Sequence, residues 1–191
     1  MSPYLASCFP TSFVNRSAHT PQWFLLITAL ATGAVVMALE IVGSRLLAPV
    51  FGNSLFVWGA LIGVILAAMS SGYAFGGWLS DRYPGAQVLA GLLLFSGAWT
   101  FLIAWFGQLV LFKVAGVIED PRWGPCVAAA LLLGPPAFGL SGVLPVLLRL
   151  AVSDLEYFGR HTGRMIALST VGSLAGTWGT AFFFLSWIGS Q

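Results

Sequence analysis

Five long apolar stretches, separated by short polar ones, constrain this sequence more than any other feature. The first, from Trp23 to about Val50, exceeds the ~20 residues that an α-helix needs to cross the hydrocarbon core of a bilayer. Since 58% of the residues are hydrophobic and only 7% are charged, the chain lacks the polar surface of a water-soluble domain. The pattern predicts an all-α integral membrane protein with spans over approximately residues 23–50, 54–79, 87–112, 126–152 and 165–188.

The segments outside these spans are short. Residues 1–22 are predicted to form a polar tail, and no cleavage site follows the first apolar stretch, which should therefore remain as a helix. The two cysteines, Cys8 and Cys126, have no spacing that suggests a metal site, and a bridge between them is not expected. The net charge of +2 is small and scattered, which argues against a nucleic-acid partner.

The distribution of basic residues predicts an orientation. Cytoplasmic loops carry an excess of Lys and Arg, so the N-terminus is expected inside. The opposite side would then hold Lys113 and Arg122, with Arg45 near that boundary and two acidic residues, Glu119 and Asp120, beside them. The inside segments would hold most of the fixed positive charges, at Arg16, Arg82, Arg149, Arg160 and Arg164.

Small residues recur every four positions in two of the spans and predict close helix contacts, because small side chains let helix backbones approach each other. In the second span Gly72 and Gly76 lie next to a further stripe formed by Gly59, Gly63, Ala67 and Ser71. The fifth span carries a similar face, formed by Ser169, Gly172, Ser173, Gly176 and Thr180.

Glu40 lies inside the first predicted span, somewhat beyond its midplane at ~1.5 Å of rise per residue. A carboxyl group at that depth must be protonated, paired or directed into a water-filled cavity. Two interpretations stay open: a structural residue that fixes helix packing, and a site for a proton or a cationic substrate. Arg45, on a different face of the same helix, is interpreted as an interfacial anchor, with a substrate ligand as the alternative.

The fourth span and the third are both interrupted. Pro135 and Pro136 each remove a backbone donor and predict a break in the fourth helix. This break is either a packing device or the wall of a cavity lined by freed carbonyl groups. In the third span Gly107 and Gln108 interrupt the apolar run. The run up to Trp105 is predicted to cross the membrane, and residues 106–117 are either its continuation or an interfacial segment.

Polar motifs follow two of the spans. The run GGWLSDR, ending in Asp81 and Arg82, resembles the loop between helices two and three of major facilitator transporters. That resemblance implies that Asp81 caps or pairs with a neighbouring helix end and that Arg82 stays in the cytoplasm. A solvated turn is the alternative. Arg149 and Arg164 are the charges at the ends of the loop between the last two spans.

Four runs of sequence carry a wider resemblance. They are EIVGSRLLAP at 40–49, GYAFGGWLSDR at 72–82, GVLPVLLR at 142–149, and TGR at 162–164 followed by STVGSLAGT at 169–177. In this order they resemble the membrane-embedded N-terminal region of bacterial spermidine synthase-like proteins, which join a major-facilitator-like half to a polyamine aminopropyltransferase. The resemblance implies a bacterial inner-membrane protein with one further span, followed by a Rossmann-like domain that uses decarboxylated S-adenosylmethionine and a polyamine acceptor.

This chain has no glycine-rich nucleotide loop after a strand, since the glycines between Gly72 and Gly77 lie in a predicted span. No catalytic or cofactor-binding residue is therefore expected in it. The preferred hypothesis is a membrane domain that anchors or supplies a cytoplasmic aminopropyltransferase domain or subunit. The alternatives are a transporter of a cation or polyamine that uses Glu40 and the break at Pro135 and Pro136, and a structural scaffold. The end at Gln191 is compatible with a fragment or with a separate membrane subunit.

Overall fold

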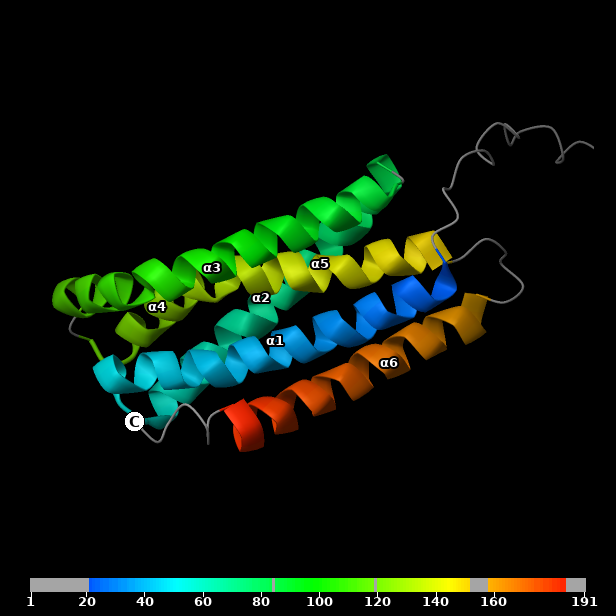
Figure 1. Cartoon of the computed structure of the whole chain (residues 1–191). Coiled ribbons are helices and arrows are strands. Elements are labelled where there is room, and N and C mark those ends of the chain that lie inside the picture. The colour runs from blue at the N-terminus through cyan, green and yellow to red at the C-terminus, as the bar shows by residue number, and fades with distance from the viewer. Residues whose placement is uncertain (1–20, 84, 119, 152–157, 185–191) are drawn as a thin grey trace, which may run out of the picture.

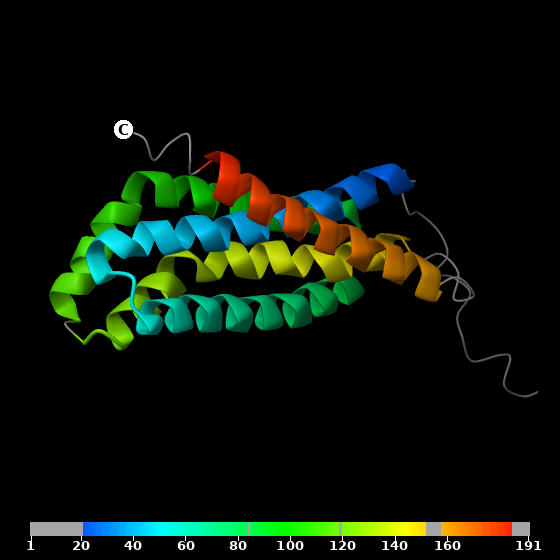
Figure 2. The ribbon, with the colours of Figure 1, turned by 90° about the horizontal axis from the view of Figure 1, so that it is seen from below.

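The computed structural model describes residues 21–83, 85–118, 120–151 and 158–184, and these residues form an elongated bundle of helices with no strand among them (Figures 1 and 2). The prediction of an all-helical bundle is confirmed. Among the described residues, four helices are long and apolar enough to cross a membrane: α1 (Gln22–Phe51), α2 (Leu55–Arg82), α3 (Ala86–Val117) and α5 (Gly134–Ala151).

The first three predicted spans correspond to α1, α2 and α3. Between α1 and α2, Gly52 adopts φ 78°, a value that favours glycine. The Ser54 hydroxyl then caps α2 by accepting a hydrogen bond from the Val57 N–H at 3.4 Å. Of the two interpretations of the residues after Trp105, the structure shows the continuation of the third span, because α3 passes through Gly107 without a break. One glycine costs a helix only about 1 kcal/mol, and Gly107 is buried. The tail, residues 1–20, lies outside the described residues.

The fourth predicted span consists of two helices. A short α4 (Trp123–Leu132) ends just before Leu133, and α5 continues in nearly the same direction, as Figure 1 shows. The break at Pro135 and Pro136 is therefore confirmed. Pro145 lies inside α5 without interrupting it. The span begins three residues earlier than predicted, because Trp123 and the next two residues form the first turn of α4.

The fifth predicted span differs most from the structure. α6 (Phe158–Trp178) begins in the segment that was predicted to be a loop, and a π-helical segment (Gly179–Phe184) follows it. Arg160, His161 and Arg164 occupy the first turns of α6, and α6 is not among the four helices that are apolar enough to cross a membrane. The last predicted residues of this span, 185–188, lie outside the described residues.

Two parallel helix pairs organise the bundle. The most extensive contacts join α1 to α6 and α2 to α5, and α3 packs against α5. In Figure 1, α1 and α6 run in one direction along the bundle, whereas α2 and α5 run in the other. One hydrophobic cluster, which includes Leu61, Leu111 and Leu133, contains residues of α1, α2, α3, α4 and α5. A second, which includes Leu25 and Val143, contains residues of α1, α3, α5 and α6.

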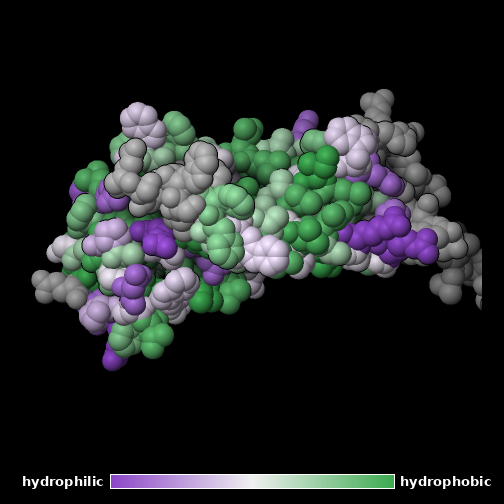
Figure 3. Space-filling view, turned by 60° about the horizontal axis from the view of Figure 1, so that its bottom comes forward, coloured by the Kyte–Doolittle hydropathy of each residue, from purple (hydrophilic) through white to green (hydrophobic). Residues whose placement is uncertain are grey.

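Large apolar side chains also cover much of the outside. Leu94 is 73% exposed, Trp105 72% and Phe112 64%. On the face drawn in Figure 3, hydrophilic side chains gather toward the two ends of the molecule and hydrophobic ones cover the stretch between them. An apolar exterior of this extent marks a surface that contacts lipid or another protein.

Candidate functional site

Two glycines of α2 lie directly against the backbone of α5. A Cβ atom on Gly72 would fall on the Phe138 carbonyl oxygen and the Ser141 hydroxyl. A Cβ atom on Gly76 would fall on the Gly142 carbonyl oxygen and lie 2.6 Å from the Gly142 Cα. The two helices can approach this closely only because both positions lack a side chain.

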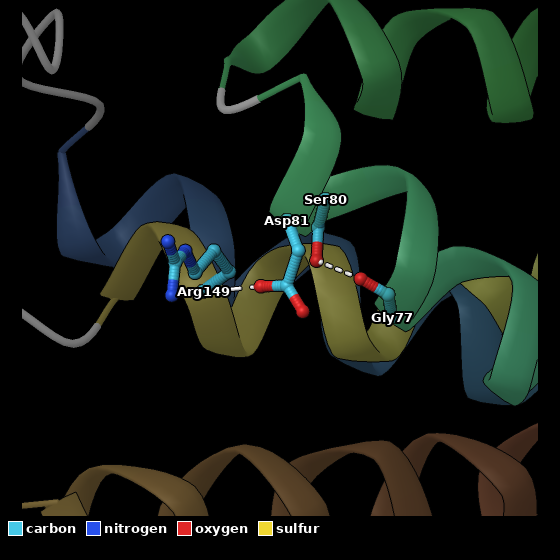
Figure 4. Close-up of polar contacts among 4 residues, drawn as sticks. All are labelled: Gly77, Ser80, Asp81 and Arg149. Atoms are coloured by element: carbon cyan, nitrogen blue, oxygen red, sulfur yellow. Dashed lines mark hydrogen bonds and ion pairs between the residues drawn. The ribbon is translucent and has the colours of Figure 1, made fainter.

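An ion pair lies where the α2–α5 contact ends. The Arg149 guanidinium of α5 is 3.6 Å from the Asp81 carboxylate of α2 (Figure 4), and the two side chains are 56% and 72% exposed. Beside them, the buried Ser80 hydroxyl donates a hydrogen bond to the Gly77 carbonyl at 2.8 Å. An ion pair this exposed contributes little stability, so the close contact of the two helices rests on the glycines described above.

The structure therefore brings together two of the six charged residues singled out in the sequence. The expectation that Asp81 pairs with a neighbouring helix end is met by Arg149. Arg82, the last residue of α2, is exposed and makes no ion pair within the described ranges. Arg164 lies on α6 and is not part of this pair; it lines a small cavity between α1, α6 and the end of α5.

That cavity has a volume of about 30 Å³ and contains polar groups that sequence reasoning did not identify. Its lining includes Gln22 at the start of α1 and His161 beside Arg164 on α6. The adjacent Thr162 hydroxyl is buried and has no hydrogen-bond partner in the described part of the chain. The space is sufficient for a water molecule, which needs about 10–15 Å³ by this measure. Nothing in the sequence pattern marked the start of α6 as a neighbour of α1.

The α1–α6 contact repeats the use of small residues. A Cβ atom added to Gly33, Gly172 or Gly176 would fall on a backbone carbonyl group of the opposite helix. The Ser173 hydroxyl donates a hydrogen bond to the Gly33 carbonyl at 3.2 Å, which links the two helices directly. The small-residue face predicted on the fifth span is therefore a helix contact.

The first small-residue stripe of α2 is not used in this way. Gly59, Gly63, Ala67 and Ser71 are all exposed, and a Cβ on either glycine would meet nothing within 4 Å. Only the neighbouring stripe, with Gly72 and Gly76, packs against another described helix.

Glu40 and Arg45 lie on α1, at a distance from the Asp81–Arg149 pair. Glu40 is half-buried and makes no hydrogen bond or ion pair with any group in the described ranges. Arg45 is exposed near the end of α1, as its interpretation as a boundary residue requires. The two side chains do not form a pair with each other.

The helix break at Pro135 and Pro136 packs against α1. Pro136 is fully buried, and a Cβ on Gly43 would overlap the side chain of Leu133, the residue at the break. The groove beside the break is lined by apolar side chains of α3 and α4. These contacts fit the interpretation of the break as a packing device better than a cavity for a cation.

Comparison of the chain with protein-family models, with curated proteins and with solved structures finds no match. Within the described residues, no three His, Cys, Asp or Glu side chains gather where they could hold a metal ion.

Proposed function

We propose that this chain is a multi-pass membrane domain of the kind found in bacterial spermidine synthase-like proteins, which anchors or supplies a cytoplasmic aminopropyltransferase domain or subunit. One observation supports this proposal above all. The runs 72–82 and 142–149, which carry much of the family resemblance, lie along a single helix contact that ends in the Asp81–Arg149 ion pair. In this proposal decarboxylated S-adenosylmethionine and the polyamine bind the partner domain.

The helix lengths support placement in a membrane. At ~1.5 Å per residue, α1, α2 and α3 are about 42–48 Å long, more than the ~30 Å hydrocarbon core of a bilayer. Their outward side chains are largely apolar. Tilting, or extension of the helix ends into the headgroup region, accommodates the additional length.

The charges support an inner-membrane orientation with the N-terminus inside. The end of the bundle at which α1 begins also holds the end of α2, the end of α5 and the start of α6, and therefore Arg82, Arg149, Arg160 and Arg164. The opposite end holds Arg45, Lys113 and Arg122, with Asp120 among them. The first end thus holds four basic residues against three at the opposite end, an excess that favours a cytoplasmic location for the first end.

The packing favours an anchor over a mobile carrier. Between α2 and α5 the backbones touch at two positions one helical turn apart, and the groove beside the helix break offers a cation no polar ligand. Such a bundle holds its cytoplasmic end in a fixed arrangement, which a soluble domain can use as a docking platform.

The test is recovery of an enzyme activity. The chain is expressed with an affinity tag in its native host, captured from solubilised membranes, and assayed for aminopropyl transfer from decarboxylated S-adenosylmethionine to a polyamine. Activity should be captured with the chain and be lost from Arg82→Glu, which reverses an exposed charge at the cytoplasmic end. The matched variant Arg122→Glu, at the opposite end, should retain it. The proposal fails if capture recovers no activity above an unrelated tagged membrane protein, or if both variants behave alike.

A second candidate, transport of a cation such as a polyamine, is favoured by Glu40 alone, a half-buried acidic residue inside α1 that lacks a partner in the described ranges. Uptake of labelled spermidine into vesicles containing the chain tests it, with Glu40→Gln as the variant. A transporter loses uptake while remaining folded, an anchor shows no uptake with either protein, and a packing role lowers the amount of folded protein in the membrane.

A further inference from the structure

A groove of about 290 Å³ runs along α3 beside the last turn of α4. Several of its side chains are open to the outside, with Leu102 47% exposed, Phe106 54% and Leu131 51%. All the lining side chains are aliphatic or aromatic: Trp99, Leu102, Ile103, Phe106, Val110, Leu131 and Leu132. Along α3 the groove extends from Trp99 to Val110, about 17 Å at ~1.5 Å per residue.

A basic residue continues the same face of α3. Trp99, Phe106 and Lys113 are spaced seven residues apart, so each lies within about 20° of the previous one around the helix axis and ~10.5 Å further along it. Lys113 is exposed and makes no ion pair with any residue that the structure describes. The nearest basic residue along the chain beyond α3, Arg122, is directed to α2, where its guanidinium lies 5.4 Å from the centre of the Phe56 ring.

We propose that this groove binds one acyl chain of an anionic phospholipid whose phosphate lies at Lys113. The site rests on the membrane placement proposed above and not on the aminopropyltransferase partner. Positive charge beyond one end of an apolar groove complements a ligand with a hydrocarbon tail and a negative head. A polyamine has the wrong charge for Lys113 and would find no acceptor among the lining side chains.

The lysine beyond the groove favours a lipid over an apolar helix of another protein. A hydrocarbon chain with a negative head group would fill the apolar groove and pair with Lys113, whereas an apolar helix would leave Lys113 without a counter-charge. Because lipid tails already surround the protein in a bilayer, apolar contact by itself gives no preference for one lipid. Selectivity must therefore come from the head group, and one lysine near the surface contributes about a five-fold preference for an anionic lipid.

The test is native mass spectrometry of the full chain in mild detergent, titrated separately with phosphatidylglycerol and phosphatidylcholine. The wild type should retain one phosphatidylglycerol molecule with about five-fold higher affinity than phosphatidylcholine. Lys113→Gln should remove this preference, whereas Arg122→Gln should keep it. Leu102→Trp, which fills the groove, should lose the bound lipid. Leu94→Trp, which adds the same bulk at an exposed position of α3 outside the groove, should retain it.

Several results would overturn the proposal. They are equal affinity of the wild type for the two lipids, unchanged lipid retention in Leu102→Trp, and loss of retention in Leu94→Trp as well. A dimer that Leu102→Trp abolishes would assign the groove to a second copy of the chain. Since no outcome depends on aminopropyl transfer, failure here and failure of the anchor proposal are distinguishable.

Discussion

Replacing Gly76 with alanine should destabilise the bundle, because the new methyl group would meet the backbone of α5. Its carbon would lie 2.6 Å from the Gly142 Cα, where ordinary contacts begin at 3.4 Å, so the helices must separate by about 1 Å. A gap of about 0.5–1 Å already forfeits a quarter to a half of the dispersion attraction between facing atoms. Overpacking of this kind costs about 1–3 kcal/mol in the free energy of unfolding.

The adjacent glycine provides a matched control. A Cβ on Gly77 would meet nothing within 4 Å, so Gly77→Ala should be neutral or stabilise the helix by about 0.5–1 kcal/mol. Gly142→Ala should fall between the two. Its Cβ would lie 3.1 Å from the Gly72 carbonyl oxygen and 3.6 Å from the Gly76 Cα, which requires a smaller displacement.

The measurement is unfolding in mixed micelles of a mild detergent and dodecyl sulfate, followed by circular dichroism. A difference of about 1.4 kcal/mol corresponds to a tenfold change in the folded-to-unfolded ratio, so Gly76→Ala should unfold at clearly lower dodecyl sulfate than Gly77→Ala. Equal stability of these two variants would refute the close contact between α2 and α5.

Three further predictions use the same unfolding assay. Gly172→Ala should cost about 1–3 kcal/mol because its Cβ would meet the α1 backbone, whereas Gly163→Ala, whose Cβ meets nothing within 4 Å, should not; equal losses would contradict the α1–α6 contact. A double-mutant cycle on Asp81 and Arg149 should give a coupling of about 0.2–1 kcal/mol that weakens with added salt, and a coupling well above this range would mean that the pair is shielded from water. Gly52→Ala should cost about 1 kcal/mol because φ is 78°, even though its Cβ meets nothing, and unchanged stability would argue against that conformation.

Local chemistry made part of this fold predictable. A glycine followed two residues later by a capping serine predicts a turn between helices, and Gly52 and Ser54 form one. Consecutive prolines predict a break, and α4 ends just before Pro135 and Pro136. The interruption expected at Gly107 is absent, because a single glycine weakens a helix by only about 1 kcal/mol and the apolar residues of α3 continue on both sides of it.

The partners of the predicted residues were beyond reach of sequence reasoning. Period-four spacing is identical for the stripe with Gly59 and Gly63 and the stripe with Gly72 and Gly76, yet only the second faces another described helix. Which stripe is covered depends on where α5 lies, and that is a property of the whole bundle. For the same reason the sequence could predict that Asp81 pairs with a helix end, but it could not identify Arg149 as the partner.

The start of α6 was mistaken for a loop because its residues are charged. Arg160 and Arg164 exclude this segment from the centre of a membrane, but Arg is a good helix former, so the helix extends beyond the apolar residues. Charge thus located the edge of the apolar region and not the end of the helix.

The parallel pairing of α1 with α6 has a consequence for biosynthesis. The Ser173 hydroxyl and the Gly33 carbonyl that it contacts are 140 residues apart in the chain. At about 5–20 residues per second, a ribosome needs roughly 7–28 seconds to synthesise the intervening segment. During that interval the face of α1 that contains Gly33 lacks its α6 partner, and in the membrane placement proposed above lipid would cover it. Although α1 precedes the other described helices in the chain, its packing is therefore completed only when α6 arrives.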